Sequence, residues 1–161
     1  MKIAPDAMLK MYQYCADLML LNLQGITHEQ SLYQPAAGVN SINWLVGHLI
    51  SSRTRILACL GQPAIWSGEQ RARYRNGSDV IAANGPGVMQ MDSLVRDYRL
   101  SHEATIIGFH GITPEHMDDP SDFRGPTIAD TLLYLKFHEA HHIGQIMSVR
   151  EHLGLSSSWL T

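Results

Sequence analysis

The chain has 161 residues, of which 45% are apolar and 17% charged, and its net charge is −3. This composition predicts one globular domain over residues 1–161 and excludes a disordered protein. No long basic run occurs, so we expect no nucleic-acid binding. The apolar stretch Leu18-Met19-Leu20-Leu21 is too short to cross a bilayer, so we expect no membrane segment. Two cysteines and no signal-peptide pattern predict a reducing, cytoplasmic setting without disulfides.

Two helices are predicted in the first half of the chain. The first covers residues 5–23, because Pro5 suits the start of a helix and Gly25 follows its apolar period. The second covers residues 41–60, with Ser41 as N-cap and Gly61-Gln62-Pro63 as its stop. A short helical turn is expected between them, at residues 27–30.

Two further helices are predicted in the second half. One covers residues 88–109 and ends before Gly111 and Pro114; the other covers residues 128–153. Thr127 caps the last helix, and Asp130 occupies its capping-box position. The fold class predicted is therefore all-α, a four-helix bundle with a long connection between helices 2 and 3.

That connection, residues 63–86, is rich in turn residues such as Asn76-Gly77-Ser78. A connection of this length suits a crossover or a functional loop. It also contains Arg71-Ala72-Arg73-Tyr74-Arg75, where three arginines in a loop favour a solvated surface over a phosphate site.

Three of the chain's nine histidines, His138, His141 and His142, lie close together in the last helix. His138 and His142 are four residues apart, so they project from one helix face at adjacent turns and can approach one metal ion. His141 is three residues from His138, so the spacing alone leaves it open as a ligand; it lies at the edge of this face and favours solvent or a supporting role.

A third ligand is predicted on the second helix, where His48 shares a largely apolar face with Trp44 and Leu45. Facing helices of a bundle build metal sites from such side chains. Three imidazoles with one open position are typical of catalytic rather than structural zinc. From spacing alone, a core histidine with a hydrogen-bond partner is the alternative.

The segments Asn43-Trp44 with His48, and His138-Glu139-x-x-His142-x-Gly144-Gln145, resemble the DinB-like (DinB/YfiT) superfamily of four-helix bundles. The resemblance covers nearly the whole chain. It implies a metal triad of His48, His138 and His142, one divalent ion and a homodimer. It also implies a small-molecule substrate and, from characterised relatives, a low-molecular-weight thiol as co-substrate. Zinc is the first expectation, with nickel, iron or manganese as alternatives.

Two chemistries fit such a site, hydrolysis by an activated water and transfer by an activated thiol, and the resemblance favours the thiol. Five residues are candidates for the pocket or the surroundings of the ligands: Trp44, Arg55, Tyr134, His141 and Gln145. Ordinary packing, or a salt bridge for Arg55, is the alternative for these residues. Glu139 is expected to face a neighbour or solvent rather than the metal.

Two further expectations concern stability. Gly144 is costly within a helix, which predicts a close helix crossing inside the bundle or between subunits. Neutral imidazoles bind metals, so metal loss is expected between roughly pH 6 and 5.

Other functions share this architecture. A ferritin-like di-iron bundle needs a second Glu-x-x-His motif, which the chain lacks, and the His-Glu-x-x-His protease motif is absent. A metal-stabilised or metal-sensing interaction module without turnover remains an alternative, as does a bundle whose histidines are incidental.

Overall fold

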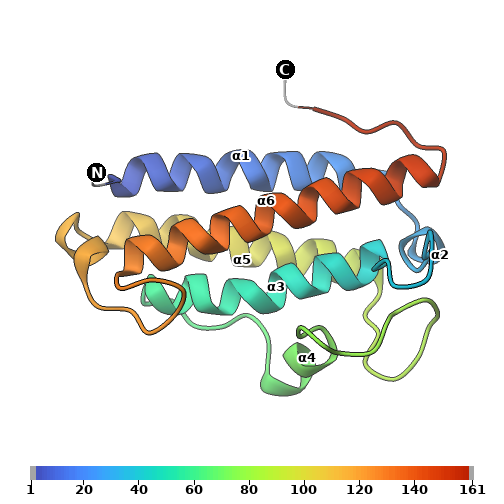
Figure 1. The fold of residues 1–161 in the computed structure, drawn as a ribbon, viewed down its shortest axis with the longest axis horizontal. Helices are drawn as coiled ribbons and strands as arrows, with labels where there is room; N and C mark the ends of the chain where they lie inside the picture. Colours follow the sequence, from blue (N-terminus) through green and yellow to red (C-terminus); the bar gives the residue numbers. More distant parts are fainter. Residues whose placement is uncertain (1–2, 160–161) are drawn as a thin grey trace.

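The computed structural model describes residues 3–159, in which four long helices form a bundle (Figure 1). The long helices are α1 (Pro5–Leu23), α3 (Ile42–Cys59), α5 (Met91–Gly111) and α6 (Ile128–His152). Three short ones join them, namely α2 (His28–Ser31), α4 (Gly68–Arg73) and the 3-10 helix η1 (Glu115–Asp118). The predicted all-α bundle is confirmed. Within the described residues, no helix is long and apolar enough to span a membrane.

The direction of the helices explains the long connection after α3. Both α1 and α3 pack against α5 and α6. Figure 1 shows α1 and α6 running one way, and α3 and α5 running the other. Because α3 and α5 are parallel, the chain must return along the bundle between them. The 18 residues of α3 correspond to roughly 27 Å of helix. The connection therefore has to be long, and α4 lies within it.

The helix ends follow local chemistry. Ser41 Oγ accepts a hydrogen bond from the backbone N–H of Trp44, and Thr127 forms the predicted capping box with Asp130. The predicted turn at residues 27–30 is α2, which has a capping box of its own. Two differences stand out: α5 begins at Met91 rather than at 88, and α4 falls in a stretch expected to be irregular.

The bundle interior consists of two apolar clusters. One, toward the α2 end, includes Met19, Leu45 and Ile146. The other, toward η1, includes Met8, Ile56 and Leu132. Burial of these side chains supplies most of the free energy that favours the bundle.

A buried polar layer lies between the two clusters, formed by Arg53 of α3, Tyr98 of α5, and Lys136 and Glu139 of α6. Arg53 Nε and Nη2 donate to Glu139 Oε1 at 2.9 and 2.6 Å. The Tyr98 hydroxyl donates to the same oxygen at 2.9 Å and accepts from Arg53 Nη2. Burial alone would lower the pKa of Arg53, but the Glu139 carboxylate and Tyr98 raise it, so the guanidinium remains charged. The layer connects three helices by charge-assisted hydrogen bonds.

Glu139 therefore faces a neighbouring helix, as predicted. Lys136, one turn earlier, donates to the sulfur of the buried Cys15 on α1. Burial raises the pKa of the Cys15 thiol, so it remains protonated. Both cysteines are free, and Cys15 belongs to the apolar core.

Candidate metal centre

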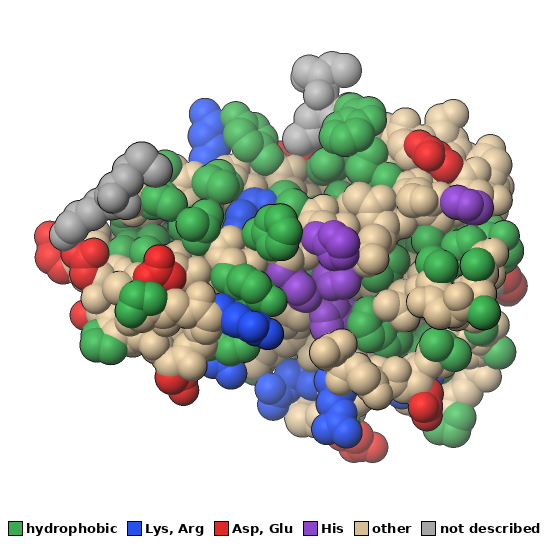
Figure 2. Space-filling view, viewed as in Figure 1, with side chains coloured by type: hydrophobic (Ala, Val, Ile, Leu, Met, Phe, Trp, Pro, Cys, Tyr) green, Lys and Arg blue, Asp and Glu red, His purple; other side chains and the backbone are tan. Residues whose placement is uncertain are grey.

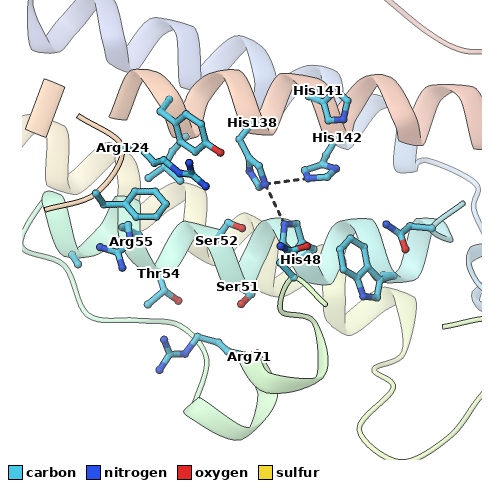
Figure 3. Close-up of a pocket in the computed structure, with 17 residues that line it drawn as sticks. His48, Ser51, Ser52, Thr54, Arg55, Arg71, Arg124, His138, His141 and His142 are labelled. Atoms are coloured by element: carbon cyan, nitrogen blue, oxygen red, sulfur yellow. Dashed lines mark hydrogen bonds between the residues drawn. The ribbon is translucent and has the colours of Figure 1, made fainter. Parts of the chain in front are cut away.

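Three histidines meet between α3 and α6 (Figure 3). His48 extends from α3, and His138 and His142 extend from adjacent turns of α6. His138 Nε2 is 3.1 Å from His48 Nε2 and 3.1 Å from His142 Nε2. One ligand nitrogen from each ring lies within 4.8 Å of the other two. The structure thus brings together the three residues predicted as ligands.

Hydrogen bonds at the far side of two rings determine their tautomers. His48 Nδ1 is 2.9 Å from the backbone carbonyl oxygen of Tyr74, which can only accept. His142 Nδ1 is 2.7 Å from the side-chain oxygen of Gln145. Each Nδ1 therefore carries the proton and donates it, leaving a lone pair on Nε2. Gln145 thus contacts a candidate ligand, in the supporting role that metal-bound histidines require.

This arrangement fits a cation. His138 Nε2 faces the lone pairs on Nε2 of His48 and Nε2 of His142. It carries at most one proton and can donate it to only one of them. At least one of the two nitrogen–nitrogen contacts therefore has no hydrogen between its atoms. Two nitrogens at the usual distance from a tetrahedral zinc ion are roughly 3.3 Å apart. The observed separations of 3.1 Å are close to that value. The cluster could therefore hold a metal ion.

Burial keeps the three rings neutral. Burial is the largest cause of a shift that lowers the pKa of both His138 and His142 from 6.5 to about 4, and the neighbouring histidines contribute to it. Burial likewise lowers the pKa of His48, against the opposing effect of its bond to Tyr74. At neutral pH these imidazoles are in the form that binds metals.

The segment after α4 orients His48 through a contact that no sequence motif indicated. The Tyr74 ring lies against Gly47, where an added Cβ would be only 2.1 Å from a ring carbon. The Tyr74 hydroxyl donates to Asn43 at 3.1 Å and accepts from the Met89 N–H at 2.8 Å. Glycine at position 47 is therefore what allows Tyr74 to approach and present its carbonyl to His48.

The histidines form part of the wall of an open cavity of about 840 Å³. Figure 2 shows the histidine side chains gathered in the middle of this face, with Lys and Arg side chains below and to their left. Hydroxyl groups, aromatic rings and guanidinium groups line the rest of the cavity. Among the lining residues are Ser51, Ser52, Arg71, Asn76, Phe123 and Arg124.

The family model described as the DinB superfamily matches residues 11–146 of the chain. The chain belongs to the DinB superfamily. The match includes His48, His138 and His142, and it confirms the resemblance that the histidine motifs indicated. A search of curated proteins finds no match.

Four of the five other candidate residues line the cavity of this DinB protein: Trp44, Arg55, Tyr134 and His141. Trp44 stacks on the His48 ring at 4.6 Å between centroids, with planes 7° apart. Tyr134 lies 6.4 Å from the His138 ring. His141 is exposed and lies beside the cluster rather than in it. Arg55 lines the cavity and also forms the expected surface ion pair, 3.5 Å from Asp122.

Two expectations need correction. A Cβ on Gly144 would meet nothing within 4 Å, so no close helix crossing inside the bundle explains this glycine. The arginine run at 71–75 is not simply a solvated loop, because Arg71 and Arg73 end α4, Arg71 lines the cavity and Tyr74 is fully buried.

Proposed function

We propose that this protein is a metal-dependent enzyme acting on a small molecule, with one divalent ion held by His48, His138 and His142. The observation that carries the proposal is the convergence of three Nε2 atoms on the wall of an open cavity. Three protein ligands beside a solvent-reachable space are typical of catalytic metal sites, whereas structural sites are closed by a fourth ligand.

Zinc is the ion we propose first. Imidazole also suits nickel and iron, and manganese is a further alternative. Since all three ligands are neutral, an ion here would keep its full charge and would lower the pKa of a water or thiol entering its open position. The protein's own part is to hold the rings, which the Tyr74 carbonyl and Gln145 do for His48 and His142.

The lining of the cavity supports thiol transfer over hydrolysis. None of the lining residues is Asp or Glu, so no carboxylate is placed there to take a proton from an attacking water. A thiol needs less help, because its deprotonated form is already a strong nucleophile. We therefore propose a low-molecular-weight thiol as co-substrate.

A metal-sensing or metal-stabilised module without turnover is the second candidate. The size of the cavity supports the enzyme instead, since about 840 Å³ is within the range of small-molecule sites. Family resemblance also leads us to propose a homodimer, and the two free cysteines lead us to propose a cytoplasmic location. Leu133 and Phe137 on α6, which are 41% and 71% exposed, are apolar surface that a second copy would cover.

The test is an assay of thiol consumption. The zinc-loaded protein would be mixed with a panel of small thiols and an aryl halide as electrophile. We expect thiol loss that is abolished by chelation and by His142→Ala but kept in His110→Ala, a control on the exposed end of α5. Ester hydrolysis without thiol consumption would favour the hydrolase. No turnover with either class, despite a bound ion, would favour the sensing module.

A further inference from the structure

The cavity is strongly polarised in charge. Three arginines line it, Arg55, Arg71 and Arg124, and none of the lining residues is acidic. The whole chain, by contrast, has a net charge of −3. Figure 3 shows these three arginines around one half of the cavity and the histidines at the other. Positive charge is thus concentrated where a ligand would enter.

Arg124 is held in place by its loop. Among the described residues it is the one non-glycine residue with a positive φ, 58°. Such a conformation costs roughly 1–2 kcal/mol and persists only where the surroundings impose it. Here two backbone hydrogen bonds close the loop, each 3.0 Å long. The Ser121 N–H donates to the Pro126 carbonyl, and the Ile128 N–H donates to the Asp119 carbonyl. Strained residues of this kind cluster at binding sites.

Aromatic rings support the same side chain. The Arg124 guanidinium is 5.1 Å from the Tyr134 ring and 5.8 Å from the Phe123 ring. Phe123 is itself fixed, because its carbonyl accepts from Thr131 and its ring packs edge-on against Tyr134. Stacked guanidinium groups keep their in-plane donors free for a ligand.

The arginines are not neutralised by the protein. Within residues 3–159, neither Arg71 nor Arg124 forms an ion pair, and Arg71 donates only to the Ser67 carbonyl at 3.4 Å. The partner of Arg55 is Asp122, which is 96% exposed and 3.5 Å away. A solvated pair of this kind is weak and readily exchanged for a ligand.

We propose that this half of the cavity binds an oxyanion, a carboxylate or a phosphate group of the substrate or co-substrate, through Arg71 and Arg124 with help from Arg55. Guanidinium groups match both anions with paired hydrogen bonds. The inference rests on the proposed function, since it places the anion at one end of a molecule whose reacting group faces the histidines. The enzyme therefore takes anionic small molecules and rejects their neutral analogues.

Calorimetric titration with two probes, succinate and inorganic phosphate, tests the inference. Both are titrated into the full-length protein and into His142→Ala, whose missing ligand removes binding to a metal as an explanation. We expect saturable binding in both backgrounds, weakened roughly tenfold by Arg71→Gln or Arg124→Gln. Arg99→Gln, an exposed arginine on α5 outside the cavity, should have no effect. Succinamide, a neutral analogue of succinate, should not bind.

Tighter binding of succinate would identify a carboxylate ligand, and tighter binding of phosphate a phosphate ligand. The inference is overturned if neither probe binds, or if Arg99→Gln weakens binding as much as Arg124→Gln. The arginine variants should also keep their metal. The anion-binding proposal can therefore be refuted while the proposed metal-dependent function stands, and the proposed function can be refuted while anion binding is observed.

Discussion

The buried pair of Arg53 and Glu139 predicts a large loss of stability when one partner is removed. Their side chains are 1% and 2% exposed. Glu139→Ala would leave a guanidinium deep between the two apolar clusters with only the Tyr98 hydroxyl as partner. Leaving such a charge uncompensated costs about 3–5 kcal/mol. For a chain of this length, that is a fall in Tm of roughly 10 °C.

The double variant Arg53→Met with Glu139→Leu distinguishes the effect of an unpaired buried charge on stability from the effect of side-chain packing. Within the described residues, Arg53 Nη1 and Glu139 Oε2 are buried without hydrogen-bond partners, so the pair is not fully satisfied. Replacing such a pair by apolar side chains is often neutral or stabilising. The double variant should therefore recover most of the stability lost in Glu139→Ala.

Urea unfolding of the wild type, Glu139→Ala, the single variants Arg53→Met and Glu139→Leu, and the double variant would measure the coupling. Asp122→Ala is the matched control, because it breaks an ion pair at the surface rather than in the core and should change stability little. The reasoning is refuted if Glu139→Ala costs less than about 1 kcal/mol, or if the double variant is as unstable as the single one.

Three further predictions concern the metal centre and α6. Gly47→Ala should lower the free energy of unfolding by about 1–3 kcal/mol, because the added Cβ would overlap the Tyr74 ring. Gly144→Ala should raise it by about 1 kcal/mol, because the added Cβ would meet nothing within 4 Å. Equal effects of the two variants in thermal melts would contradict this prediction. Gln145→Ala should weaken zinc affinity about 10- to 100-fold by freeing the His142 ring, and an unchanged Kd would exclude that role. Acid release of the ion should occur near pH 4, because two of the three histidines have pKa values lowered to about 4. The metal content of the protein after dialysis at a series of pH values would measure it. Release of half the metal near pH 6 would count against the prediction.

The last prediction revises the sequence-based window of pH 6 to 5, which assumed ordinary imidazoles. Since the folded pKa values lie below 6.5, the unfolded chain takes up protons first as the pH falls. The contribution of these histidines to stability is therefore present above about pH 6.5 and is lost as the pH falls toward 4. The shift arises from burial, which a sequence does not reveal.

The long helices were predictable because their ends are encoded locally. Ser41 and Thr127 cap their helices as residue type and spacing indicated. The i,i+4 pair on α6 was predictable for the same reason, since helix geometry alone places His138 and His142 on one face. His48 needed the resemblance as well, because spacing within one helix does not say which neighbour it faces.

What was missed depends on contacts between distant segments. Helix α4 had a local signal, the capping box of Ser67 and Gln70, which was overlooked in a stretch rich in turn residues. Burial of Arg53 could not be inferred, since a charged residue is assigned to the surface unless its partner is known. The approach of Arg71 and Arg124 to one cavity likewise depends on how helix α4 and the loop before α6 fold back on α3 and α6.

The most direct test is elemental analysis of untagged protein purified without a metal column, beside His142→Ala and His141→Ala. The two variants remove adjacent histidines of α6, of which only His142 belongs to the cluster. We predict about one divalent ion per chain in the wild type and in His141→Ala, and none in His142→Ala. A wild type that takes up no metal even after reconstitution, or a His142→Ala variant that retains its ion, would contradict the metal centre.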